Sequence, residues 1–151
     1  MTVYEKIGTE EMKKFAKEVI NGHSKSGSVS ETAEKAVEIL HGLLEERDLI
    51  QQHGNQMFVD ILTCAAIIHD VFPVKECWTE SFTFRKELMN LASKEYEMPE
   101  PICNSLFETL EAQLGNRMPI TKCRPQPGTP QDLFATAIWI VCAVSKKRRN
   151  R

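Results

Sequence analysis

The chain has 151 residues, 42% of them hydrophobic and 26% charged, and its 19 basic and 21 acidic residues leave a net charge of −2. This length fits one domain with a real core, and this composition excludes disordered and collagen-like proteins. The balanced charge makes nucleic acid an unlikely partner. A membrane protein is also excluded, because no apolar run approaches the roughly 20 residues that span a bilayer, and the N-terminus lacks the apolar centre of a signal peptide.

The five cysteines are widely spaced and form no CxxC pair. A zinc ribbon or a secreted disulfide framework would show closer, paired cysteines. The sequence therefore predicts reduced thiols in a cytoplasmic protein. Cys64 and Cys142 lie in strongly apolar stretches and are predicted to be small core residues.

The first three helices are predicted from apolar residues at three- and four-residue spacing. Thr9 precedes a helix over 10–20, which ends at the stop signal Asn21-Gly22. Ser28 or Ser30 caps a second helix. The apolar stripes of these two helices are Met12, Phe15, Ala16 and Val19, then Ala33, Ala36, Val37, Leu40 and Leu44.

The third helix, over 57–68, is apolar nearly all round, which is typical of a central, buried helix. A fourth covers 80–96, with Phe84, Leu88, Leu91 and Ala92 facing inward.

Prolines predict where the remaining helices begin. Pro99 and Pro101 open a fifth helix, which Gly115 closes, and three prolines make 116–128 a predicted loop. Thr129-Pro130 start a last helix, apolar over 133–144. No alternating strand pattern is present. The sequence predicts an all-α bundle of about six helices, one domain over residues 1–145 followed by a basic tail at 146–151.

His69 and Asp70 stand side by side at the C-terminal end of the central helix. Two ionisable groups on a core helix need partners, because burying them unpaired costs several kcal/mol. A divalent cation is a suitable partner, since helix C-termini carry partial negative charge and imidazole with carboxylate binds Mn, Fe, Co, Zn or Mg. The competing interpretation is a satisfied core histidine followed by a helix-end aspartate.

His23 precedes the second helix, and Asp132 lies in the first turn of the last one. The order His…His-Asp…Asp, in the segments GHS, AAIIHD and QDLFATA, resembles the HD-domain family of metal-dependent phosphohydrolases over most of the chain, 23–144. The resemblance implies that His23, His69, Asp70 and Asp132 hold one metal ion. In that family the metal polarises a phosphoryl group and lowers the pKa of bound water. The sequence has no histidine after His69, so the mononuclear, nucleotidase-like branch fits better than a two-metal phosphodiesterase.

Two of these ligands have alternatives. His41 lies only 28 residues before His69, against 46 for His23, and is the competing first ligand. His23 is preferred because it precedes a helix where the family usually places its first ligand. Asp132 is also an ordinary helix-start acid.

Further residues of the site are predicted in the segment after the HD pair. Glu76 and Glu80 are candidates to position water or protonate the leaving oxygen. Lys75 and Arg85, together with Lys25 in the Ser/Gly-rich stretch, are candidates to bind phosphate. Solvated surface positions are the alternative for each of these residues.

The sequence thus predicts a phosphohydrolase that uses metal-activated water on a small nucleotide, either a deoxynucleoside triphosphate such as dATP or a 5'-monophosphate. A homo-oligomer is compatible with a helical surface. The alternative function is a catalytically silent HD-fold nucleotide-binding protein or a helical interaction protein. The basic tail over 146–151 is expected to be a solvated terminus that suits a helix C-terminus electrostatically.

Overall fold

The structure is a computed structural model, and it describes residues 3–23, 27–46, 56–69, 86–87, 89–111 and 130–149. Within these residues all regular structure is helical and no strand occurs, which confirms the predicted all-α class. The elements are η1 (Val3–Lys6), α1 (Glu10–His23), α2 (Glu31–Glu46), α3 (Gln56–Ile68), η2 (Leu91–Glu95), α5 (Glu100–Glu111) and α6 (Pro130–Arg149).

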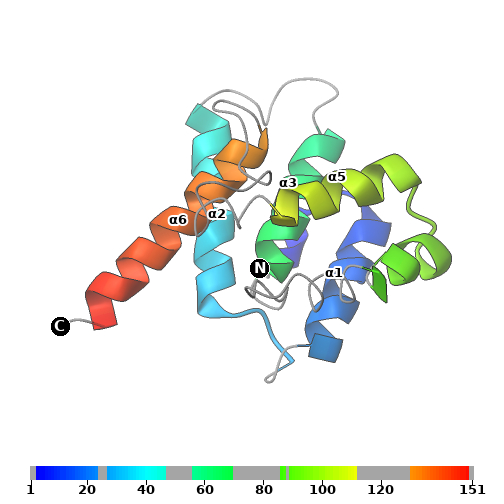
Figure 1. The fold of residues 1–151 in the computed structure, drawn as a ribbon, viewed down its shortest axis with the longest axis horizontal. Helices are drawn as coiled ribbons and strands as arrows, with labels where there is room; N and C mark the ends of the chain where they lie inside the picture. Colours follow the sequence, from blue (N-terminus) through cyan, green and yellow to red (C-terminus); the bar gives the residue numbers. More distant parts are fainter. Residues whose placement is uncertain are drawn as a thin grey trace.

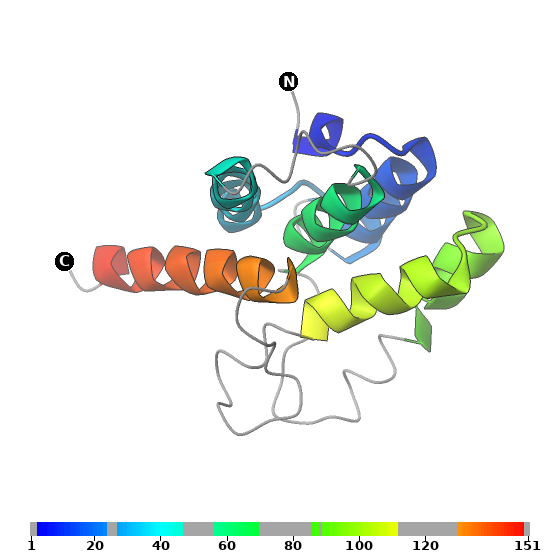
Figure 2. The ribbon, with the colours of Figure 1, turned by 90° about the horizontal axis from the view of Figure 1, so that it is seen from above.

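Helix α3 lies at the centre of the bundle. It packs against α1, α2, α5 and α6, and Figure 2 shows it between α1 on one side and α5 on the other. Every residue from Val59 to Ile68 is buried, as its all-round apolar sequence predicts. The small residues Ala65 and Ala66 are fully buried and allow neighbouring helices to approach closely.

Helices α1 and α2 each bury the stripe that the sequence predicts. At the start of α2, Ser30 is the cap, because its Oγ accepts a hydrogen bond from the backbone N–H of Ala33 at 3.1 Å. The predicted end of α1 is wrong by three residues. The helix continues through Asn21 and Gly22 to His23, so His23 is its last residue and does not stand in a break between helices.

The fourth predicted helix has a different form in the part that the structure describes. Residues 86–87 and 89–90 are α-helical, and the chain then widens into the π-helical turn η2, in which Ala92 is buried as predicted. Glu97 follows with φ 50, a left-handed conformation uncommon for a residue other than glycine. The backbone N–H of Met98 donates to the carbonyl of Ala92 at 3.0 Å, which closes this turn before α5 begins.

Helix α6 crosses α2, and its C-terminal end extends away from the other helices (Figures 1 and 2). Its first half contributes Leu133, Phe134, Ala137, Ile138 and Val141 to the core. The predicted apolar helix over 133–144 is therefore confirmed. The helix also continues to Arg149, through the first four positions of the predicted basic tail. No helix among the described residues is both long and apolar enough to cross a membrane.

Candidate functional site

His69 directly follows α3, and its side chain is only 5% exposed. Its Nδ1 lies 2.6 Å from the carbonyl oxygen of Ala66, three residues earlier. Because a carbonyl oxygen only accepts, Nδ1 carries the hydrogen and donates it. In the neutral imidazole the lone pair then lies on Nε2, the ring atom that would coordinate a metal ion.

The structure describes the other three predicted ligands to different extents. Asp132 lies in the first turn of α6 with a half-buried side chain. His23 ends α1, and only its backbone is described, while Asp70 lies outside the described residues. The described side chains include no group of three or more His, Cys, Asp or Glu residues that could hold a metal ion. Since two of the four predicted ligands are not among these side chains, the ligand set stays a prediction.

The predicted catalytic and phosphate-binding residues also stay predictions. All five of them lie outside the described residues: Glu76, Glu80, Lys25, Lys75 and Arg85.

His41, the competing first ligand, is bonded to the central helix. Its Nε2 lies 2.8 Å from the hydroxyl of Thr63, and that hydroxyl donates to the carbonyl of Val59 at 2.7 Å. A hydroxyl has one hydrogen, so Thr63 accepts from His41, and Nε2 is the protonated nitrogen. Burial lowers the pKa of His41, and the nearby Lys6 ammonium lowers it further. The carboxylates of Glu45 and Asp60 act in the opposite direction.

This hydrogen bond lies well away from the end of α3. Thr63 precedes His69 by six residues, about 9 Å along a helix axis, and the two positions point to different sides of the helix. For His41 to bind a metal together with His69, it would need to leave Thr63 and cross that distance. The geometry therefore disfavours His41 as a ligand beside His69, and His23 as the first ligand stays a prediction.

The sequence analysis missed Asp60, a buried carboxylate on α3. Its Oδ1 accepts from the backbone N–H of Gly8 at 2.9 Å and from Gln56 Nε2 at 2.8 Å. Its Oδ2 accepts from the backbone N–H of Thr9 at 3.0 Å and from Thr9 Oγ1 at 2.7 Å. A carboxylate has about four acceptor positions, and these donors occupy them. Asp60 is therefore a structural anchor and has no capacity left for a metal ion.

This anchor also explains Gly8. A Cβ added there would lie 2.7 Å from Gln56 Nε2, an atom already bonded to Asp60. A lone aspartate within an apolar helix was the available signal, but nothing in the sequence connects Asp60 to two residues about fifty positions earlier.

Two cysteines are free thiols in the described part of the chain, Cys64 and Cys103, and both are buried. Burial raises the pKa of each thiol, so the reactive thiolate is disfavoured. The prediction that Cys64 is a small core residue is confirmed.

No family model matches the chain, and no similar curated protein or solved structure was found.

Proposed function

We propose that the protein is a metal-dependent phosphohydrolase acting on a small nucleotide, a deoxynucleoside triphosphate or a 5'-monophosphate. His23, His69, Asp70 and Asp132 would hold one divalent ion among Mn, Fe, Co, Zn and Mg. The proposal comes from the likeness of the His…His-Asp…Asp order to HD-domain phosphohydrolases. The observation that carries it furthest is the hydrogen bond from His69 Nδ1 to the Ala66 carbonyl.

That hydrogen bond suits a metal ligand. Histidines that bind metals commonly donate their second ring N–H to a backbone carbonyl or a carboxylate, which fixes the tautomer and the orientation of the ring. The His69 side chain is also buried at a helix C-terminus, where partial negative charge favours a cation.

A bound divalent ion would polarise the phosphoryl group and lower the pKa of a water molecule. The chain itself supplies the remaining functions. Lys25, Lys75 and Arg85 are proposed to bind the phosphate oxygens through charge-assisted hydrogen bonds. Glu76 or Glu80 is proposed to position the attacking water or protonate the leaving oxygen.

The first test is the metal content of the full chain, purified without chelator. We expect about one Mn, Fe, Co or Zn ion per chain, since a mononuclear site of this ligand type binds one ion. We expect the ion to be lost in Asp70→Ala and in His69→Gln. His53→Ala, which changes a histidine outside the proposed ligand set, serves as the matched control and retains the metal. Wild-type protein that is metal-free and takes up none on titration contradicts the proposal.

The second test is phosphate release from deoxynucleoside triphosphates and 5'-monophosphates with each of the five metal ions added. Activity lost in Asp70→Ala and retained in His53→Ala supports the proposal. The pair His23→Ala and His41→Ala identifies the first ligand, and we expect metal and activity to be lost only in His23→Ala. Full metal occupancy without turnover of any of these nucleotides contradicts the hydrolase function and supports a nucleotide-binding protein.

A further inference from the structure

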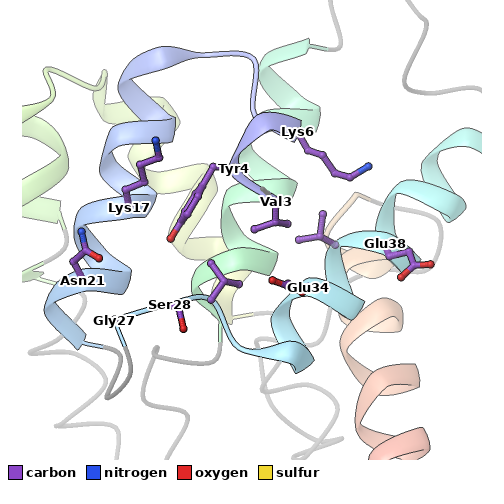
Figure 3. Close-up of a pocket in the computed structure, with 11 residues that line it drawn as sticks. Val3, Tyr4, Lys6, Lys17, Asn21, Gly27, Ser28, Glu34 and Glu38 are labelled. Carbon is purple, nitrogen blue, oxygen red and sulfur yellow. The ribbon is translucent and has the colours of Figure 1, made fainter. Parts of the chain in front are cut away.

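A cavity of about 840 Å3 lies between η1, α1 and α2 (Figure 3). This is within the size range of sites for small molecules, roughly 300–1,000 Å3. Three valines and one tyrosine supply its apolar lining: Val3, Val29, Val37 and Tyr4. Among the residues whose side chains the structure describes, His69 and Asp132 of the predicted metal site do not line this cavity.

Four charged side chains surround this apolar lining. Lys6 comes from η1 and Lys17 from α1, whereas Glu34 and Glu38 come from α2, four residues apart. In Figure 3, Lys17 lies on the α1 wall beside Tyr4, and the two glutamates lie on the α2 wall opposite. The cavity therefore has two acidic side chains on α2 and one basic side chain, Lys17, on α1 opposite them, while Lys6 extends from η1 toward the α2 side, where its charge acts on His41.

These four charges do not neutralise one another. In the described part of the chain, the ion pairs within 4.0 Å join Lys13 to Glu5 and to Glu10. The Lys17 ammonium instead lies over the Tyr4 ring, 5.5 Å from its centroid. Two glutamates four residues apart on a helix also repel each other slightly, which a cationic group beside them would relieve.

We propose that this cavity binds a small zwitterion with an apolar body, either a free apolar amino acid or a short apolar peptide. Its ammonium group would face Glu34 and Glu38, and its carboxylate would face Lys17 with the amide of Asn21. The valines and the Tyr4 ring would cover the apolar part. A simple anion is disfavoured by the two glutamates on α2 and a simple cation by Lys17 on α1, whereas a molecule with both charges complements both sides of the cavity.

The ligand side of the test uses the 15N-labelled full chain, titrated separately with leucine, the dipeptide Leu-Leu and uncharged N-acetyl-leucinamide. Leucine or Leu-Leu is expected to shift amide signals of residues 3–6, 17–21, 27–29 and 34–38. Whichever of the two binds more tightly identifies the source of the zwitterion. N-acetyl-leucinamide is expected to bind about five-fold more weakly or worse, since it lacks both charges. Equal binding of the uncharged compound overturns the proposal, and so does the absence of shifts with both zwitterions at millimolar concentration.

The protein side uses charge-removing variants with matched controls. The double variant Glu34→Gln, Glu38→Gln and the single variant Lys17→Met are each expected to weaken the zwitterion's binding about five-fold. Glu46→Gln on α2 and Lys14→Met on α1 change exposed charges that do not line the cavity, and are expected to bind as wild type does. Wild-type affinity in both cavity variants contradicts the proposal, as does equal weakening in the controls.

Discussion

Thr9 donates two hydrogen bonds to the same oxygen of Asp60, one from its backbone N–H at 3.0 Å and one from its hydroxyl at 2.7 Å. The start of α1 is thus held by a carboxylate from the middle of α3. An anion at a helix N-terminus is favourable, because the first N–H groups carry partial positive charge and lack partners within the helix.

Replacing Asp60 is expected to destabilise the fold strongly. Asp60→Ala removes the buried acceptor of the four partly buried hydrogen bonds from Gly8, Thr9 and Gln56, and we expect it to lower the free energy of unfolding by about 2 kcal/mol. Thr9→Val removes only the hydroxyl donor and is expected to cost about 1 kcal/mol. Urea denaturation, with the midpoint and the slope fitted separately, measures both. A change below about 0.5 kcal/mol in Asp60→Ala is the size expected of an ordinary surface substitution and would disprove the anchor.

The His41–Thr63 pair makes stability depend on pH. Burial lowers the pKa of folded His41 from its ordinary value of 6.5, so the unfolded chain binds the proton more readily. The free energy of unfolding should therefore fall as the pH drops below about 6.5, until the lowered pKa is reached. His41→Gln should reduce this dependence between pH 7.5 and pH 5.5 in urea denaturation. His53→Gln is the histidine control, and an identical pH dependence in wild type and His41→Gln would rule out this role.

The Tyr96 hydroxyl should ionise only at unusually high pH. Its hydroxyl donates to Glu18, and this hydrogen bond, with burial and nearby carboxylates, raises its pKa from 10.0 to about 12. The stabilisation is complete below pH 10 and is lost as the pH rises through about 12. Tyrosinate absorbance should show the titration of Tyr96 moving toward 10 in Glu18→Gln. Tyr4→Phe removes the other tyrosine and makes the assignment unambiguous; an unchanged titration in Glu18→Gln would contradict the hydrogen bond.

Truncating two aromatic residues of α6 should change the stability of the protein to very different extents. Phe134 is fully buried, whereas Trp139 is 59% exposed. Phe134→Ala leaves a cavity in the core and should cost about 3–5 kcal/mol, while Trp139→Ala should change stability by less than about 1 kcal/mol. Thermal and urea unfolding of the two variants compares them directly. Similar losses in both would mean that the rotation of α6 about its axis differs from the one described.

Local patterns predicted the buried faces better than the ends of the helices. The stripe Ala33 to Leu44 follows from period alone, because each residue needs only to fall on the correct side of α2. The end of α1 was misplaced because Asn21-Gly22 weakens a helix without forbidding it. The π-helical turn at Leu91–Glu95 has no sequence signature comparable to an apolar stripe.

The candidate site was less predictable, because its chemistry depends on contacts between distant residues. The buried position of His69 followed from the apolar run before it, but its tautomer depends on a carbonyl whose position only the folded helix sets. The anchor at Asp60 and the cavity between η1, α1 and α2 join residues from separate elements, so composition and spacing give no sign of either.

The position of α6 has a consequence for the order in which the protein becomes stable during its synthesis. This helix packs on α2, which the ribosome completes more than eighty residues earlier. Until α6 emerges, the nascent chain exposes the apolar surface that Phe134, Ile138 and Val141 later cover. Stable packing of this apolar face therefore waits until α6 has left the ribosome, and the nascent chain before that point is the form most exposed to chaperones and proteases.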